Sequence, residues 1–187
     1  MWSAGTWDAA ALTCPAGRAL DLGAGCGIQA LHLDAHCDRI VATDTNARAL
    51  ALAAATARLN GMAWDLRAGS LFDPVAGERF DLIVSNPPFV ITPRVAGVPL
   101  MEYRDGGMVG DSLVRTVVHQ VEAHLEPGGV AQLLGNWEIP AGARWQDVVD
   151  ELLAPTGLDA WVVQRETQDP AEYAELWIRD GGHRPGT

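Results

Sequence analysis

Cysteine is scarce in this chain of 187 residues, and lysine is absent. The three cysteines, Cys14, Cys26 and Cys37, are odd in number and show no C-x-x-C spacing. This usage argues against a disulfide framework and favours reduced thiols in a cytoplasm. The chain also lacks an apolar run long enough to span a membrane. We therefore expect a cytoplasmic protein with no signal peptide and no membrane partner.

Positive charge is the second deficit. Thirteen basic residues, all of them arginine, face 24 acidic residues, and the net charge is −11. Because non-specific nucleic-acid binding depends on basic surface that displaces counterions, the chain as a whole is poorly suited to it. Arg94, Arg104 and Arg115 fall in or near the segment after Phe89. They form either a local basic rim or a set of scattered surface arginines.

The most informative stretch is Ser85-Asn86-Pro87-Pro88-Phe89, which follows an apolar run over residues 80–84. The run predicts a buried strand, and two consecutive prolines then exclude helix and end sheet pairing. Asn86 is thus held on a stiff turn at the edge where open α/β sheets bind ligands. A rigid amide, the carbonyl of Pro87 and the ring of Phe89 suit the binding of a planar –NH2 group. An ordinary turn is the plainer alternative.

Two further strand ends carry ligand-binding signals. The apolar segment 18–22 precedes the glycine-rich loop Gly23-Ala24-Gly25-Cys26-Gly27 and a helical pattern. Glycines there allow a tight turn and close approach of a ligand, and residues 25–30 even satisfy the dinucleotide G-x-G-x-x-A pattern. The segment 39–44 ends in Asp44, whose carboxylate can accept both hydroxyls of a ribose or begin a helix as its N-cap.

Together these residues resemble the class I S-adenosylmethionine (SAM)-dependent methyltransferases. Asp21 to Gly27 is similar to their E/D-x-G-x-G-x-G loop, and Asp44 matches their ribose-binding acid. Residues 86–89, the NPPF motif, match the [D/N]-P-P-[Y/F] signature of the amino-group N-methyltransferases. That group includes N6-adenine DNA methylases, rRNA guanine-N2 methylases and the HemK/PrmC-like glutamine-N5 methylases of release factors.

The resemblance implies SAM as the cofactor and a set of site residues. The implied catalytic residues are Asn86, Pro87 and Phe89. The implied SAM-binding residues are Asp21, Gly23, Ala24, Gly25, Gly27, Asp44, Thr45, Ser70, Leu71 and Asn86. Asp21 either lies near the methionine amino group or is a buried acid that caps the glycine loop. Ser70 occupies the position where the family often has an aspartate that contacts adenine. His32, His36 and Cys37 lack further ligands nearby in sequence, so we expect no metal site.

The alternation of strand and helix patterns predicts a Rossmann-like, doubly wound, mostly parallel sheet. Expected strands cover 18–22, 39–44, 64–68, 80–85 and 129–135, and expected helices cover 27–36, 46–59, 112–125 and 144–153. Segments 158–166 and 175–179 read as an antiparallel hairpin that completes a seven-stranded methyltransferase sheet. Residues 90–111 contain many prolines and glycines, and we expect a mobile loop. The whole chain, 1–187, is expected to be one catalytic domain, either complete or part of a longer protein.

The methyl acceptor is less clearly marked. Residues 101–113 resemble the E-P…G-G…D-G-L segment of glutamine-N5 methylases, although Tyr103 replaces the proline and Ser112 the later glycine. With the acidic charge, this favours a protein glutamine or a similar small-molecule amide. A nucleobase of rRNA or DNA is the alternative within the enzyme class. Outside it, a non-catalytic SAM- or nucleotide-binding module remains open, and an NAD oxidoreductase leaves the double proline unexplained.

Overall fold

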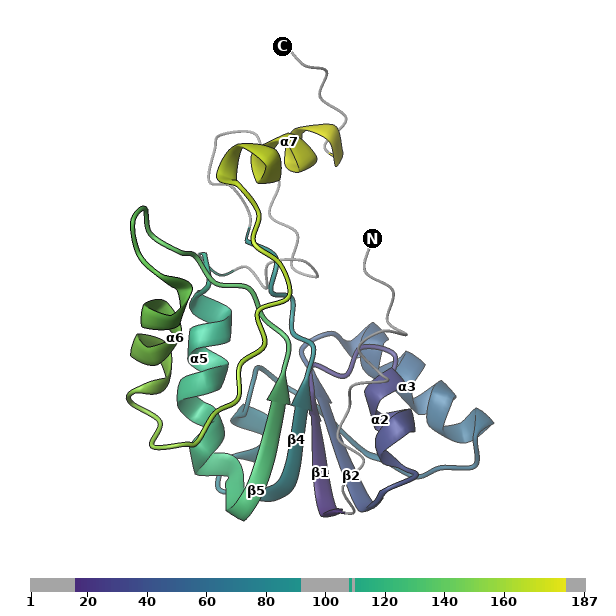
Figure 1. Cartoon of the computed structure of the whole chain (residues 1–187). Helices are drawn as coiled ribbons and strands as arrows, with labels where there is room; N and C mark the ends of the chain where they lie inside the picture. Colours follow the sequence, from purple (N-terminus) through teal and green to yellow (C-terminus); the bar gives the residue numbers. More distant parts are fainter. Residues whose placement is uncertain (1–15, 92–107, 109, 181–187) are drawn as a thin grey trace.

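Five parallel strands form the sheet in the computed structural model, which describes residues 16–91, 108 and 110–180 (Figure 1). They are β1 (Ala16–Leu22), β2 (Cys37–Asp44), β3 (Asp65–Ala68), β4 (Phe80–Ser85) and β5 (Leu125–Leu133). Their spatial order is β3-β2-β1-β4-β5. The chain moves outward from β1 to β3 and then returns to add β4 and β5 on the other side. The topological switch, where such folds bind ligands, therefore lies between β1 and β4.

Helices cover both faces of this sheet (Figure 1). The helical elements are α2 (Ile28–Leu33), α3 (Ala47–Leu59), η1 (Asp73–Val75), α5 (Ser112–Val121), η2 (Glu122–His124), α6 (Trp145–Leu153) and α7 (Pro170–Asp180). Ala19 of β1 packs with Ala30 of α2 on one face. The next residue, Leu20, packs with Val117 of α5 on the other, as the alternation of side chains along a strand requires. The expected doubly wound, parallel architecture is confirmed.

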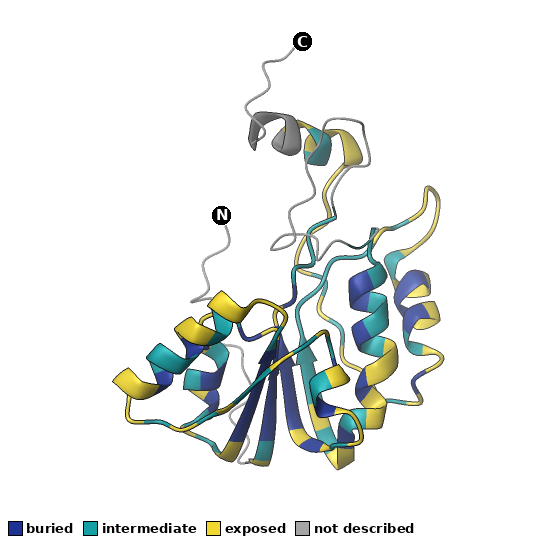
Figure 2. Ribbon diagram, turned by 180° about the vertical axis from the view of Figure 1, so that it is seen from behind, coloured by how far each residue is buried: buried dark blue, intermediate teal, exposed yellow. Residues whose placement is uncertain are grey.

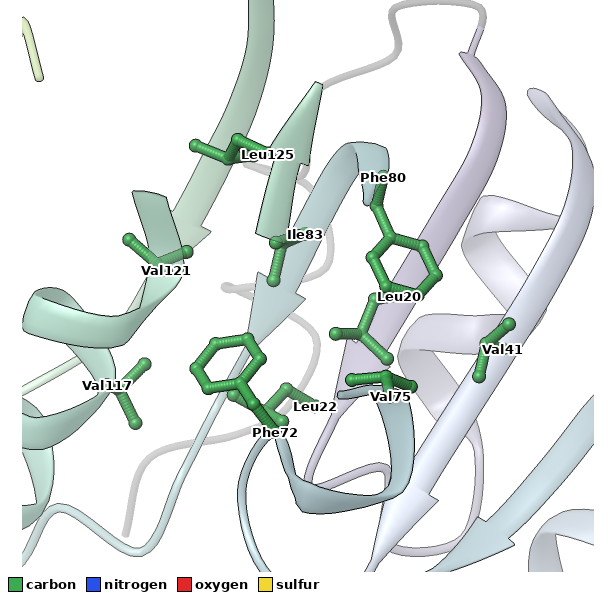
Figure 3. Close-up of a cluster of buried hydrophobic side chains, with 10 residues drawn as sticks. All are labelled: Leu20, Leu22, Val41, Phe72, Val75, Phe80, Ile83, Val117, Val121 and Leu125. Atoms are coloured by element: carbon green, nitrogen blue, oxygen red, sulfur yellow. The ribbon is translucent and has the colours of Figure 1, made fainter. Parts of the chain in front are cut away.

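The larger core cluster fills the face beneath α5 and η1 (Figure 3). Its buried members are Leu20, Leu22, Val41, Phe72, Val75, Phe80, Ile83, Val117, Val121 and Leu125. The central strands are almost wholly buried, whereas the outer faces of the helices are exposed (Figure 2). Strands covered on both faces read as continuous apolar runs, which is why β1 and β4 were visible in the sequence.

The expectations of seven strands and a closing antiparallel hairpin are wrong for the described residues. Residues 158–166 form no strand, and residues 175–179 lie within α7. The Asp169 carboxylate accepts a hydrogen bond from the backbone N–H of Ala171 (2.8 Å), and Pro170 opens the helix. Aspartate before a proline at the first helical position is a strong helix start. With its partner segment in a helix, 158–166 cannot form the hairpin.

Other boundaries differ by a few residues. The helix expected over 27–36 ends at Leu33, and the one expected over 112–125 ends at Val121 and continues as η2. β5 begins at Leu125, four residues before its expected start, and its pairing with β4 carries a register shift between Phe80 and Leu82. Most of the expected loop 90–111 lies outside the described residues. No helix in the described ranges is long and apolar enough to cross a membrane.

Candidate active site at the carboxyl ends of the strands

The glycine loop links β1 to α2 and is fixed to the neighbouring strand. The backbone N–H groups of Gly23 and Ala24 both donate to the carbonyl of Thr43 at 2.9 Å. Gly27 has a φ of 84°, in the left-handed region. A Cβ there would lie 2.7 Å from a ring carbon of Trp64 and 3.3 Å from the Cβ of Ala53. Glycine is therefore required at this position by backbone conformation and by packing together.

Asp44 lies at the end of β2, beside that loop. One carboxylate oxygen accepts from the N–H of Gly25 (2.9 Å), and the other accepts from the N–H of Asn46 (2.8 Å). The N-cap of α3 is Asn46, whose side chain accepts from the N–H of Arg48 (2.9 Å). Asp44 is thus not the helix cap. A carboxylate has about four acceptor positions, so two remain for a ligand.

Asp21 is fully buried on the side of β1 that faces α2. One of its carboxylate oxygens accepts from the N–H of Ala30 (2.9 Å), and the other has no hydrogen-bond partner. Burial raises the pKa of Asp21 to about 7, against the lowering effect of the Ala30 N–H, and the nearby charge of Asp44 raises it further. Asp21 is thus a buried acid, as one alternative expected, but the N–H that it accepts from belongs to α2 and not to the glycine loop.

The segment after β3 approaches Asp44 from the other side, because the N–H of Gly69 donates to the Asp44 carbonyl at 3.1 Å. Ser70 is exposed there. Leu71 has a φ of 46°, which among the described non-glycine residues is the one positive value. Phe72 is buried and stacks on the His124 ring with centroids 4.5 Å apart. Non-glycine residues with positive φ concentrate at functional sites. The site role expected for Ser70 and Leu71 stays a prediction.

The turn after β4 begins from a buried anchor. Ser85 is fully buried, its hydroxyl donates to the Leu22 carbonyl (2.7 Å), and its own carbonyl accepts from the N–H of Leu134 (3.1 Å). Asn86 follows, exposed and without a hydrogen bond to any other described residue. Pro87 is buried and Phe89 is half-buried. The amide side chain is thus presented outward on a backbone that is fixed from below.

The structure gathers most of the expected site residues at one edge of the sheet. Leu22 and Ser85 are direct neighbours in the pairing of β1 with β4, so the glycine loop and Asn86 leave the sheet side by side. Asp44 is joined to the loop through Gly25. Thr45 is exposed next to Asp44. In the described residues no group of three or more His, Cys, Asp or Glu side chains could hold a metal ion.

Two residues near this edge were not expected from the sequence. Ser85 is one, because a single serine at the end of an apolar run carries no local signal of its partner. Tyr173 of α7 is the other: its hydroxyl donates to the carbonyl of Ile91 at 2.7 Å, two residues after Phe89. Figure 1 shows α7 beyond the carboxyl ends of the strands. The Asp169-Pro170 pair could have revealed this helix.

Comparisons with known proteins agree with this picture. The methyltransferase small domain family model matches residues 9–156. The release factor glutamine methyltransferase of Xylella fastidiosa is 36% identical over 138 residues, which cover 68% of this chain and 50% of that protein. The ribosomal RNA small subunit methyltransferase C of an Enterobacter species is 30% identical over 145 residues, which cover 75% of this chain and 38% of that protein. The chain therefore spans half or less of the length of these relatives.

Solved structures show the same fold. A methyltransferase from Pyrococcus furiosus superposes with a TM-score of 0.62 at 20% sequence identity, and the match covers 88% of this chain and 76% of that one. At this level of identity the likeness establishes the shared architecture.

Proposed function

Because the chain belongs to the methyltransferase small domain family, which confirms its resemblance to SAM-dependent methyltransferases, we propose that it transfers a methyl group from SAM to a planar amino or amide nitrogen. The observation that carries this proposal is the position of Asn86. It leaves β4 on a double-proline turn directly beside the point where the glycine loop leaves β1. A methyl donor on that loop and an acceptor nitrogen at Asn86 would meet at the topological switch.

The residues at this edge fit SAM. The space beside Gly25 is open, because no atom lies within 4 Å of a Cβ built on it, so a ligand can approach the loop backbone there. Asp44 retains acceptor positions for ribose hydroxyls, and the unpaired buried oxygen of Asp21 can accept a hydrogen bond from a donor on the ligand. We assign the adenine end to Ser70 and Leu71. When bound, SAM supplies a methyl group on a positively charged sulfur.

Asn86, Pro87 and Phe89 would then hold the acceptor. The side-chain oxygen of Asn86 and the carbonyl of Pro87 can each accept one N–H bond from the target nitrogen. This removes the nitrogen's freedom to rotate and favours a lone pair directed out of its plane. The Phe89 ring can stack on the planar group. Such positioning contributes up to roughly 7–11 kcal/mol in ideal cases. The methylated nitrogen is acidic, so its proton can leave to solvent without a dedicated base.

We favour a protein glutamine, or a similar amide, as the acceptor. The net charge of −11 opposes binding to a nucleic-acid backbone. The relative from Xylella fastidiosa is named for glutamine methylation. The resemblance of residues 101–113 to glutamine-N5 methylases points the same way, although most of that segment lies outside the described residues. A cytoplasmic location is part of this proposal.

A nucleobase amino group is the second candidate. It is favoured by the relatives named ribosomal RNA small subunit methyltransferase C, of which the one from an Enterobacter species matches 75% of this chain, against 68% for the glutamine methyltransferase of Xylella fastidiosa. An amide nitrogen and an exocyclic amino group present the same planar –NH2 to Asn86. The turn itself therefore does not distinguish them.

The test is methyl transfer from isotopically labelled SAM to two purified acceptors, a bacterial release factor and small-subunit ribosomal RNA. Mass spectrometry should find the label on a glutamine side chain of the release factor. Label on a guanine or adenine would replace the amide by the nucleobase. Binding of SAM without label on either acceptor, or on any component of a cell extract, would favour the non-catalytic binding module.

A further inference from the structure

Ser85 connects the two segments that a methyl transfer would have to align. It is the last residue of β4 and pairs with Leu22, the last residue of β1. The chain continues from Leu22 into the glycine loop and from Ser85 into the turn of Asn86. No other residue of β4 lies as close along the chain to Asn86. The geometry of the site therefore depends on how this pair of strand ends is joined.

The Ser85 side chain makes that connection. Its hydroxyl donates to the Leu22 carbonyl at 2.7 Å, in a position with no exposed surface. A buried hydroxyl without a partner destabilises a fold by about 1–3 kcal/mol, so this hydrogen bond is needed wherever a serine is buried. Alanine would fill the same place without that requirement. Alanine would also leave the Leu22 carbonyl without this donor, so it should cost some stability as well as the link between the two strand ends.

The neighbouring contacts show what the hydroxyl adds. On the side of β2, the start of the glycine loop is held by the N–H groups of Gly23 and Ala24, which both donate to Thr43. On the side of β4, the Ser85 hydroxyl holds Leu22. On its far side, Ser85 is held to β5 through the N–H of Leu134. Together these hydrogen bonds join the ends of β2, β1, β4 and β5, and the Ser85 bond is the one next to Asn86 in the chain.

We propose that Ser85 is a positioning residue that fixes the separation between the glycine loop and Asn86, and so aligns the methyl group with the acceptor nitrogen. This inference rests on the proposed function. In the transfer the bond between the methyl carbon and sulfur breaks, its electron pair stays on sulfur, and the nitrogen lone pair forms the new carbon–nitrogen bond. The nitrogen then releases its proton to solvent. In-line displacement is sensitive to shifts of about 1 Å between the reacting atoms.

The chain offers a matched control. Thr156 is also buried, and its hydroxyl donates to the Leu153 carbonyl at 2.8 Å. It lies near the amino ends of the strands, away from the candidate site. A Cβ on its neighbour Gly157 would lie 3.8 Å from the carboxylate of Glu122, which comes just before the start of β5. Ser85→Ala and Thr156→Val each remove a hydroxyl-to-carbonyl bond, and Thr156→Val also removes the acceptor of the Leu158 N–H (3.2 Å), so it is at least as large a perturbation. Both should lower the melting temperature, but only the first should change the alignment of the site.

The first readout is the single-turnover rate of methyl transfer to an acceptor that the wild type methylates. SAM and this acceptor are both saturating. Ser85→Ala should lower this rate about tenfold, equivalent to ~1.4 kcal/mol, while the Kd for SAM stays within about twofold. Thr156→Val should retain the wild-type rate. Ser85→Cys, whose thiol is a weak donor of similar size, should lie between. It replaces Ser85→Ala in every comparison if the alanine variant does not fold.

The second readout needs no acceptor. With S-adenosylhomocysteine bound, the heteronuclear NOE of the Asn86 backbone amide reports how ordered the turn is. We expect an ordered amide in the wild type and in Thr156→Val, and a more mobile one in Ser85→Ala. A wild type that methylates no acceptor would count against the proposed function alone, and the NOE would then decide the role of Ser85. The inference would be overturned if Ser85→Ala showed the same order of the Asn86 amide, or the same transfer rate, as Thr156→Val.

Discussion

The Asp44 carboxylate accepts a hydrogen bond from the backbone N–H of Gly25 at 2.9 Å, which joins the end of β2 to the glycine loop. The residue expected to bind the ribose therefore also shapes the loop that would hold the rest of the cofactor. Its second oxygen is held by the N–H of Asn46. Both oxygens are oriented before any ligand arrives, and such preorganisation lowers the entropy lost on binding.

Asp44→Ala should weaken SAM binding by about 1.5–3 kcal/mol, which is the usual contribution of a hydrogen bond to a charged group. Isothermal titration calorimetry with SAM and S-adenosylhomocysteine measures the change. Asp38→Ala, an exposed aspartate at the other end of β2, is the matched control and should bind normally. Undiminished binding in Asp44→Ala would show that the ribose lies elsewhere.

Asp21 should make stability depend on pH. Burial raises its pKa to about 7 from the usual value of about 3.9, so between these values the folded chain keeps a proton that the unfolded chain has released. Stability must then fall as pH rises through that range, and level off above it. Asp21→Asn cannot titrate, so the wild type should lose stability relative to this variant between about pH 4 and pH 7. Urea unfolding at several pH values tests this, and parallel curves for the two proteins would contradict it.

Gly27→Ala should destabilise the fold more than Gly61→Ala. Both glycines have a positive φ, 84° and 72°, which costs an alanine about 1–2 kcal/mol. A Cβ on Gly61 meets nothing within 4 Å, whereas one on Gly27 would lie 2.7 Å from Trp64. Crowding of this kind adds about 1–3 kcal/mol. Denaturant unfolding of the two variants separates the effects, and equal losses would mean that Trp64 moves aside freely.

Tyr173→Phe removes the hydroxyl that joins α7 to Ile91. The bond is partly buried, so its net contribution is about 0.5–1.5 kcal/mol, and the global melting temperature should change little. Hydrogen exchange in the first turns of α7 should become faster, because the described side chains of that helix are otherwise mostly exposed. Unchanged exchange there would show that the helix is held by other contacts.

The sequence located the two segments that face each other at the switch point, because their signals are local. A short apolar run followed by two prolines is typical of a strand end, and glycines after a strand mark a tight loop. The Leu22–Ser85 bond could not be foreseen, because it joins residues 63 positions apart and depends on strand pairing. Register of that kind is a property of the sheet.

The hairpin prediction failed for a different reason. Apolar residues recur at Leu158, Trp161 and Val163, and such a segment is easily read as a strand. Only Leu158 packs against the core, while Trp161 is 93% and Val163 is 64% exposed. Burial depends on whether a partner strand exists, and the Asp169-Pro170 pair had placed the candidate partner in a helix.

The measurement that tests the central claim most directly is single-turnover methyl transfer by Asn86→Ala. The side chain is exposed and makes no hydrogen bond to another described residue, so thermal stability should be nearly unchanged. The rate should fall by about a hundredfold or more, because the lost contact orients the attacking nitrogen in the transition state. Asn86→Asp, which keeps an acceptor oxygen, should be milder, and Asn60→Ala at the end of α3 should transfer normally. Near-normal transfer by a folded Asn86→Ala would contradict the account.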